Sequence, residues 1–298
     1  MDITIVIPIY NREKYIGSTL ESIAKSSVMP KSIILVDNNC TDGSMDICNR
    51  FKAEHETDDL SIVVTEEKKT GANAARNKGL QLCKTEWVYF FDSDDTFDSS
   101  FIQSMDRINK ECDCICFPTV MNVDGKQRVR KFRNSPDVPF QILTGMLSTQ
   151  SMLFRTDFLK KIGGWNESIQ VWQDWELGTR LLLSYPIIHW VPKPFHNILV
   201  HGDSITGNKL SDRYSERIHT MKTVCAQLKG NKQRKALILR SYILLGMFRR
   251  EENHDAVNAC MAYIKKNFAN KYGTIGKVIS NYVAMGGHGA WRIAYLLG

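Results

Sequence analysis

The sequence predicts an α/β fold whose first ninety residues form an open, largely parallel sheet, followed by a mixed second half and a helical C-terminal region. Apolar, β-branched runs without strict alternation begin about every 28 residues, which is typical of strands buried on both faces of a parallel sheet. Segments with apolar residues at helical spacing separate these runs and fit right-handed crossovers. Ligands of such sheets bind beyond the carboxyl ends of the strands, so functional residues are expected directly after each strand.

The predicted elements follow one another in a regular order. The strands of the first part share short β-rich runs and are expected at 3–7, 33–36, 62–64 and 87–91. The helices between them are expected at 16–23, 45–51 and 72–82. Past residue 110, strands are expected at 114–120 and 151–155 with a turn at Asp124-Gly125, and helices at 173–181, 214–228, 233–248 and 255–268.

Composition narrows the class of protein. With 43% apolar and 24% charged residues, and only 19 Gly and 8 Pro, the chain is neither disordered nor collagen-like. No apolar run approaches the roughly 18 residues that span a bilayer. Met1-Asp2 leads straight into an apolar run without a signal-peptide pattern, so a cytoplasmic location is expected. Cys112, Cys114 and Cys116 alternate as in a strand, which favours buried reduced thiols over a zinc site.

Charge divides the chain near residue 205. Residues 1–205 contain 23 Lys and Arg and 27 Asp and Glu, whereas residues 206–298 contain 16 Lys and Arg and 5 Asp and Glu. A basic tail indicates an anionic partner. No nucleic-acid motif is present, and Val278 to Leu297 carries apolar residues with Trp291, Arg292 and Tyr295, so peripheral contact with an anionic membrane surface is favoured over nucleic acid. A helical cap or a homodimer interface remains the alternative.

The end of the first predicted strand lacks the glycines of a phosphate-binding loop. Pro8-Ile9-Tyr10-Asn11 contains no Gly, which excludes a dinucleotide fingerprint or a P-loop at this position. Asp37 ends the second strand, where a carboxylate can accept hydrogen bonds from a base or a ribose. Thr41 and Asp42 are interpreted as caps of the next helix.

After the third strand, Gly71 opens a helix of small residues that bears Arg76. Such a helix N-terminus can approach phosphate, and Arg76 can add a charge-assisted contact. Close packing of the helix on the sheet, with a solvated Arg, explains the composition equally well.

The strongest signal follows the fourth strand, where Asp92, Ser93, Asp94 and Asp95 succeed two Phe residues. Three carboxylates in four residues repel one another unless a cation or hydrogen-bond donors are present. Hard oxygen ligands suit Mg²⁺ or Mn²⁺. The alternative is an acidic turn that caps a helix.

A second polar region lies downstream. Asp174 falls in the first turn of a predicted helix, where the helix dipole favours its ionised form, and it can serve as a general base or as an ordinary cap. Trp165 and Trp175 can form a sugar platform. His201 is a lone imidazole on a loop, for which a structural role and a metal role both stand.

These motifs occur in the order found in family 2 inverting glycosyltransferases, which the chain resembles from residue 1 to about 205. The motifs are Ile7-Pro8-Ile9-Tyr10-Asn11, Val36-Asp37-Asn38, Gly71 with Ala75-Arg76-Asn77, Phe91 to Asp95, Gly163-Gly164-Trp165, Asp174 to Leu177 and Leu199-Val200-His201. The resemblance implies an α/β fold of GT-A type, a Rossmann-like mixed sheet flanked by helices. Residues 1–205 would form the nucleotide-sugar-binding catalytic domain, and 206–298 a basic helical C-terminal extension.

The resemblance also implies roles for individual residues. Donor nucleotide contacts fall to Pro8, Tyr10, Asn11, Asp37, Arg76, Asp92 and Ser93. Metal ligands would be Asp92, Asp94 and His201 for Mn²⁺ or Mg²⁺, the catalytic base Asp174, and the acceptor or sugar contacts Trp165, Trp175 and Asp95. Two departures stand out: the family's usual Asp-Asp reads Asp37-Asn38 here, and its usual Glu-Asp reads Gln173-Asp174.

The implied activity is transfer of a hexosyl or N-acetylhexosaminyl group, with inversion, from a nucleotide-diphosphate sugar to a hydroxyl of a glycan or lipid-linked acceptor. UDP is the expected nucleotide and surface polysaccharide synthesis the expected setting, in the cytoplasm or peripherally on the inner face of the cell membrane. A nucleotidyltransferase would need a Gly-rich loop after strand one, and a glycoside hydrolase needs no nucleotide pocket. A non-catalytic sugar-nucleotide-binding or scaffold protein is the remaining alternative.

Overall fold

The computed structural model describes residues 1–108, 111–123, 125–200, 209–269 and 271–297. These residues form two compact units. The first comprises 1–135, 147–170 and 184–200, and the second comprises 136–146, 171–183 and the described residues from 209 onward. Two segments that precede residue 205 therefore belong to the second unit. The functional division into 1–205 and 206–298 remains a prediction.

The first unit contains a seven-stranded mixed sheet in the order β3-β2-β1-β4-β8-β5-β9. Its strands are β1 (Ile3–Ile9), β2 (Ser32–Asp37), β3 (Ser61–Glu66), β4 (Trp87–Phe90), β5 (Cys114–Cys116), β8 (Met152–Arg155) and β9 (Ile188–Trp190). The first four are parallel, whereas β8 runs antiparallel to both of its neighbours. The predicted mixed α/β architecture is thus confirmed. Chain order reverses between β1 and β4, which makes the carboxyl ends of these strands the topological switch point.

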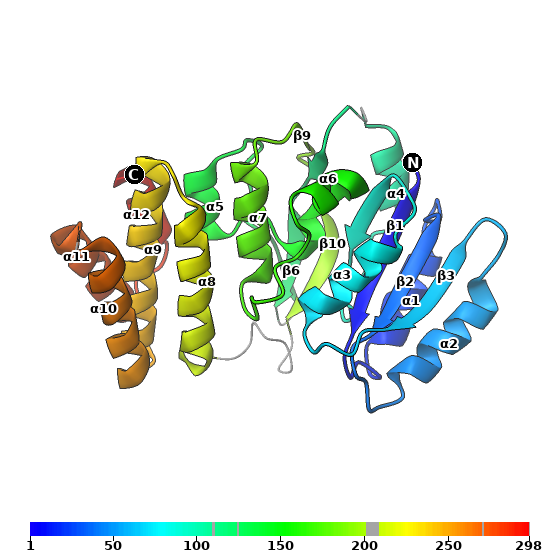
Figure 1. Ribbon diagram of the computed structural model, residues 1–298, viewed down its shortest axis with the longest axis horizontal. Helices are drawn as coiled ribbons and strands as arrows, with labels where there is room; N and C mark the ends of the chain where they lie inside the picture. Colours follow the sequence, from blue (N-terminus) through cyan, green and yellow to red (C-terminus); the bar gives the residue numbers. More distant parts are fainter. Residues whose placement is uncertain (109–110, 124, 201–208, 270, 298) are drawn as a thin grey trace. The chain divides into compact units, whose positions relative to one another are not determined.

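Helices cover both faces of this sheet (Figure 1). They are α1 (Ile16–Ala24), α2 (Ser44–His55), α3 (Ala72–Leu82), α4 (Phe101–Asp106) and α6 (Thr156–Lys161). Helices α1, α2 and α4 contribute to the core on one face, and α3 lies on the other face. Gly79 permits the close approach of α3, because a Cβ atom there would lie 2.2 Å from Val6 Cγ1.

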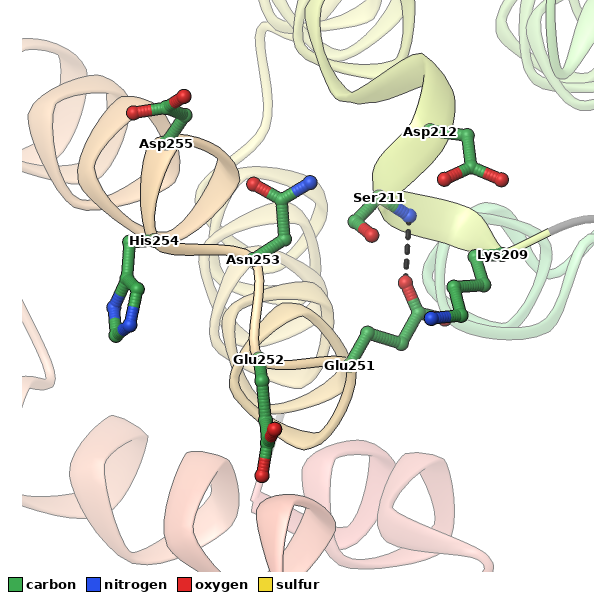
Figure 2. Close-up of a pocket in the computed structure, with 8 residues that line it drawn as sticks. All are labelled: Lys209, Ser211, Asp212, Glu251, Glu252, Asn253, His254 and Asp255. Atoms are coloured by element: carbon green, nitrogen blue, oxygen red, sulfur yellow. Dashed lines mark hydrogen bonds between the residues drawn. The ribbon is translucent and has the colours of Figure 1, made fainter.

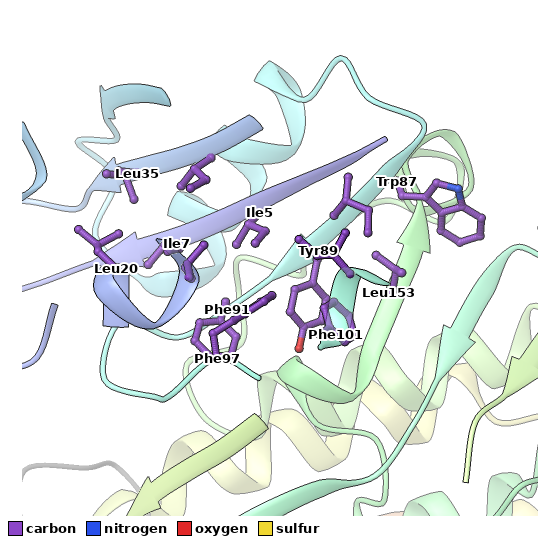
Figure 3. Packing of buried hydrophobic residues seen from close by; sticks show 14 of the residues in the cluster. Ile5, Ile7, Leu20, Leu35, Trp87, Tyr89, Phe91, Phe97, Phe101 and Leu153 are labelled. Carbon is purple, nitrogen blue, oxygen red and sulfur yellow. The ribbon is translucent and has the colours of Figure 1, made fainter. Parts of the chain in front are cut away.

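The main core lies on the face covered by α1 and α2. Ile5 and Ile7 of β1 pack with Tyr89 and Phe91, as Figure 3 shows. Tyr89 keeps its hydroxyl satisfied in this apolar setting by donating to Gln150 O at 2.8 Å. This core fixes the ends of β1 and β4, from which the candidate site is built.

One predicted strand is wrong in extent. The expected 114–120 strand divides into β5 and β6 (Thr119–Val123), and β6 joins β7 (Lys126–Val129) and β10 (Phe195–Val200) in a separate three-stranded sheet. Pro118 explains the break, since it has no N–H to donate to the sheet. Phe117 N still donates to Ser151 O, whereas Pro118 O accepts from Phe195 N, so the chain changes sheets at Pro118.

The second unit is helical. It contains α5 (Val138–Thr144), α7 (Gln173–Leu183), α8 (Tyr214–Gln227), α9 (Asn231–Arg250), α10 (His254–Phe268), α11 (Gly273–Ala284) and α12 (Ala290–Leu297). The predicted helices at 214–228, 233–248 and 255–268 are confirmed. Helices α11 and α12 fall within the predicted helical extension, for which no separate bounds were given, whereas α5 was not predicted as a helix. Helix α9 packs against α5, α10, α11 and α12. Among the described helices, none combines the length and apolar character needed to cross a membrane.

Candidate active site

The predicted strand-end residues meet at the switch point of the first unit. Pro8 is buried within β1, and Tyr10 follows with its side chain exposed. Asn11 adopts a left-handed conformation with φ 49°, and its Oδ1 accepts from Thr41 N at 2.8 Å. Asn11 therefore joins the loops that follow β1 and β2, which leaves the Tyr10 ring available to a ligand.

Asp92 is held by two donors from opposite parts of the sequence. Arg76 Nη2 lies 2.8 Å from Asp92 Oδ1, and Gln150 Nε2 lies 2.8 Å from Asp92 Oδ2. The Arg76 guanidinium also stacks over the Trp165 ring, 4.5 Å from its centroid. Arg76 is buried, so α3 presents a fixed cation to the loop after β4.

Asp95 is a buried carboxylate beneath this arrangement. It accepts from Leu199 N at 2.8 Å and from the same Gln150 amide that contacts Asp92. Burial, together with the charges of Asp92 and Asp94, raises the pKa of Asp95 well above its usual range. The structure therefore places Asp95, a predicted sugar contact, within the protein's own hydrogen-bond network.

Asp94 is less buried than Asp95, and its side chain faces Arg12. Arg12 Nε is 3.4 Å from Asp94 Oδ2. The side chains of Asp92 and Asp94 are 33% and 16% exposed, so both carboxylates remain open to a ligand. Ser93 between them is buried, and Thr19 of α1 steadies this loop by placing its hydroxyl 3.1 Å from Ser93 O and 3.0 Å from Asp95 O.

The end of β2 explains the departure from Asp-Asp. Asn38 is buried, and its Nδ2 donates to Glu67 O and Lys69 O, each at 2.8 Å. Its Oδ1 accepts from Gly71 N at 2.8 Å. A carboxylate has no proton to give two carbonyls, so this position requires the amide. Asp37 Oδ1 accepts from Cys40 N, which shapes the turn after β2.

Helix α3 also holds the loop that carries Trp165. Asn77 Oδ1 accepts a hydrogen bond from Trp165 N at 2.9 Å, and Asn77 Nδ2 donates to Trp165 O at 2.8 Å. Asn73 Nδ2 donates to Asn166 O and Ile169 O. Gly164 turns the loop with φ +62°, and a Cβ there would lie 2.7 Å from Asn77 Oδ1. Trp165 is consequently buried under Arg76 rather than presented to solvent.

Asp174 and Trp175 belong to the second unit. Asp174 lies in the first turn of α7, and its Oδ1 accepts from Trp175 N at 2.8 Å. Trp175 is buried and donates through Nε1 to Ile142 O at 3.0 Å, while Arg240 stacks on its ring. Nearby, Glu176 forms a buried ion pair with Arg180. The predicted His201 lies outside the described residues.

A pocket of about 390 Å³ in the second unit contains none of the predicted site residues (Figure 2). It is lined by Lys209, Ser211, Asp212, Glu251, Glu252, Asn253, His254 and Asp255. Glu251 accepts there from Leu210 N and Ser211 N, at 3.0 and 2.7 Å. This carboxylate stabilises the start of the short 3-10 helix η3 (Leu210–Arg213).

The donor set after β4 fits a hard divalent cation. Within the described ranges, no group of three or more His, Cys, Asp or Glu is arranged to hold a metal ion alone. Mg²⁺ commonly uses one or two carboxylates together with substrate phosphates, however, and Asp92 and Asp94 supply two partly exposed carboxylates. A cation held by these two carboxylates would also reduce their repulsion of Asp95, the lesser cause, after burial, of its raised pKa.

Sequence patterns did not single out three residues of this site. Arg12 follows the first strand and was detectable by the same strand-end rule that selected Tyr10. Gln150 and Thr19 carry no local signal, because their contacts join segments 55 to 76 positions apart in the sequence.

A mixed sheet with acidic and basic side chains gathered at its switch point has the ligand-binding arrangement typical of open α/β folds. Residues 4–164 match the family model Glycosyl transferase family 2. The match covers more than half of the chain, and the chain belongs to this family.

Individual relatives match shorter stretches. A stretch of 103 residues is 37% identical to glycosyltransferase GlyG of Streptococcus pneumoniae and covers 35% of this chain and 33% of that protein. A stretch of 116 residues is 38% identical to a poly(ribitol-phosphate) beta-glucosyltransferase of Bacillus spizizenii and covers 37% of this chain and 18% of that protein. The chain thus spans a third or less of the length of these relatives.

Solved structures share the fold. Residues 1–349 of S. aureus TarS, in complex with UDP-GlcNAc, superpose with a TM-score of 0.69 at 18% identity and cover 99% of this chain and 91% of that one. Mannosyltransferase PcManGT from Pyrobaculum calidifontis, with GDP-Man and Mn²⁺, gives a TM-score of 0.59 at 14% identity and covers 99% of this chain and 86% of that one.

Proposed function

We propose that this chain is the catalytic region of a metal-dependent, inverting glycosyltransferase that moves a sugar from a nucleotide-diphosphate sugar to an acceptor hydroxyl. The observation that carries the proposal is the set of Asp92 and Asp94, partly exposed at the switch point and each facing an arginine. Family membership supports the reaction class. A surface polysaccharide or teichoic acid is the proposed product, because relatives bear such names.

Each side chain is assigned one task. Tyr10 and Asp37 would contact the nucleobase and ribose, and Arg12 and Arg76 supply positive charge where a diphosphate leaves. Asp92 and Asp94 would hold Mn²⁺ or Mg²⁺, which supplies charge neutralisation of the leaving diphosphate when bound. Asp174 would take the proton of the acceptor hydroxyl as it attacks the anomeric carbon, and this single displacement inverts the configuration.

The donor is proposed to be a UDP-sugar carrying a hexosyl or N-acetylhexosaminyl group, and the acceptor a glycan or a lipid-linked glycan. The structure of TarS with UDP-GlcNAc supports this choice of nucleotide. PcManGT binds GDP-Man with Mn²⁺ on the same fold, so GDP is the competing nucleotide that an experiment must compare.

Isothermal titration tests the proposal. The full chain is titrated with UDP, GDP and dTDP, each with Mn²⁺ and with EDTA, and the titration is repeated with Asp94→Ala. Asp59→Ala is the matched control, because Asp59 is an exposed aspartate of the same unit outside the site. Metal-dependent binding of one nucleotide, lost only in Asp94→Ala, is expected. Binding of no nucleotide under any condition would favour the non-catalytic scaffold instead.

A further inference from the structure

Helix α11 is apolar on two faces. Its inner face packs against α9, where Gly276 contacts the Tyr242 ring so closely that a Cβ would lie 2.3 Å away. Ile279 and Val283 are buried on this inner side. Ile275, Val278, Tyr282 and Met285 recur every three or four residues on another side and are exposed. Residues at this spacing share one stripe of a helix, so α11 presents a second apolar stripe to its surroundings.

Helix α12 repeats the pattern. Ala290 and Ala294 are its buried residues, whereas Ile293, Leu296 and Leu297 are exposed at the same helical spacing. We call these seven exposed residues of α11 and α12 the outer apolar stripe. Val278 of α11 and Met285 at its C-cap are 65% and 82% exposed, and apolar side chains gathered on a surface in this way mark an interaction site.

The charged residues of the helices that carry the outer apolar stripe have one sign. No Asp or Glu follows Asp255 in the sequence, whereas Lys265, Lys266, Lys271, Lys277 and Arg292 do. Lys271, Lys277 and Arg292 belong to, or directly precede, the two helices of the stripe and are exposed. The two helices themselves carry cations and no carboxylate, and the carboxylate that contacts them is Asp137, which accepts from the Tyr295 hydroxyl of α12. Apolar side chains flanked by cations on the same helices are the pattern by which amphipathic helices dock on anionic lipid.

We propose that the outer apolar stripe and its flanking cations dock the protein on an anionic membrane surface. Charge selects this occupant over a second copy of the chain, because a symmetric dimer would bring identical cationic surfaces together. Each cation near an anionic leaflet is attracted, and each exposed apolar side chain gains by entering the headgroup region. This inference concerns a different surface from the active site and does not depend on the proposed reaction.

Vesicle sedimentation of the full chain tests the inference without nucleotide or acceptor. The vesicles contain phosphatidylcholine alone or an equal mixture of phosphatidylcholine and phosphatidylglycerol. Two variants divide the contributions: Val278→Ser with Met285→Ser removes apolar contact, and Lys277→Gln with Arg292→Gln removes charge. Tyr185→Ser with Ile187→Ser is the matched control, because these residues are 87% and 65% exposed in the other unit.

Wild type and the control are expected to sediment with the anionic vesicles and to remain in solution with the neutral ones. The apolar variant should lose affinity by about tenfold or more, and the charge variant should lose a similar factor that shrinks as salt is raised. Equal binding to both vesicle types, binding to neither, or unchanged binding of both variants would overturn the inference. Light scattering that shows a wild-type dimer dissociated by the apolar variant would also overturn it, in favour of a self-association surface.

Discussion

The side-chain amide of Gln150 donates to Asp92 Oδ2 at 2.8 Å. The same nitrogen reaches the buried carboxylate of Asp95, so one neutral donor separates two aspartates of the loop after β4. Gln150 itself lies on the short 3-10 helix η1 (Thr149–Ser151), directly before β8. The orientation of Asp92 is therefore set from η1 as well as from α3.

Replacement of Gln150 by Ala should weaken both stability and ligand binding. Asp95 would lose a donor while staying buried, which costs about 1–3 kcal/mol in the free energy of unfolding. Asp92 would keep its contact with Arg76 but lose the one that fixes Oδ2, and we expect metal-dependent nucleotide affinity to fall about tenfold. Urea unfolding and calorimetric titration measure the two effects, with the exposed Gln103→Ala as control. Lower stability with unchanged affinity would leave Gln150 a purely structural residue.

Asn38→Asp tests the amide at the end of β2. The carboxylate could not donate to Glu67 O and Lys69 O, and its charge would be buried beside them. We expect a loss of about 2–4 kcal/mol in the free energy of unfolding at neutral pH. Asn39→Asp is the matched control, because Asn39 is the exposed neighbour. Similar midpoints of urea unfolding for the two variants would refute the explanation given for Asn38.

Substitution of the two carboxylates of α7 should affect different properties, sugar transfer in one case and stability in the other. Asp174→Asn is expected to reduce sugar transfer by about 10²–10⁴-fold through loss of the general base, with nucleotide affinity and stability retained. Glu176→Gln removes a charge from a buried pair with Arg180 and should instead lower the free energy of unfolding by about 3 kcal/mol. A transfer assay and thermal unfolding separate the two. Transfer by Asp174→Asn within tenfold of wild type would remove Asp174 from the mechanism.

His196 should make the protein sensitive to acid. Its ring lies among Tyr89, Phe91 and Phe101, and burial lowers the pKa of His196 to about 3 from its ordinary 6.5. Between pH 6.5 and pH 3 the imidazole is protonated in the unfolded chain but neutral in the folded chain. The contribution of His196 to the free energy of unfolding is therefore complete above pH 6.5 and declines toward pH 3. The slope is about 1.4 kcal/mol per pH unit.

Urea unfolding between pH 7 and 5 measures that slope. His196→Gln should lower stability at pH 7, because His196 Nδ1 accepts from Asp98 N, but it should flatten the decline. The exposed His219→Gln should leave the decline as it is. A decline of equal steepness in wild type and His196→Gln would place the acid-sensitive group elsewhere.

The sequence predicted the parts of the fold that local pattern determines. Apolar runs predict β1 to β4, and the rule that ligands bind beyond strand ends selects Tyr10, Asp37 and Asp92 from the sequence. Pro118 was visible in the sequence, yet the apolar residues on both sides of it outweighed its effect on the predicted strand. The local conformational restriction prevailed in the structure, and the chain divides there.

The contacts that hold the site could not be predicted in the same way. Gln150 reaches Asp92 across 58 positions, and Asn77 reaches Trp165 across 88. No periodicity records such pairs, because they depend on how sheet and helices pack. Trp165 illustrates the limit: its position after Gly163-Gly164 was informative, but only packing shows that it supports Arg76.

The amide side chains of Asn73 and Asn77 hydrogen-bond to the backbone of the loop from Gly163 to Ile169. These bonds make the conformation of the loop depend on α3. Exchange of this loop between family members without α3 would leave its backbone groups without the amides of Asn73 and Asn77. Positions 73 and 77 should vary together with 164 and 165 as lineages diverge. A chimaera should therefore exchange α3 and the loop together.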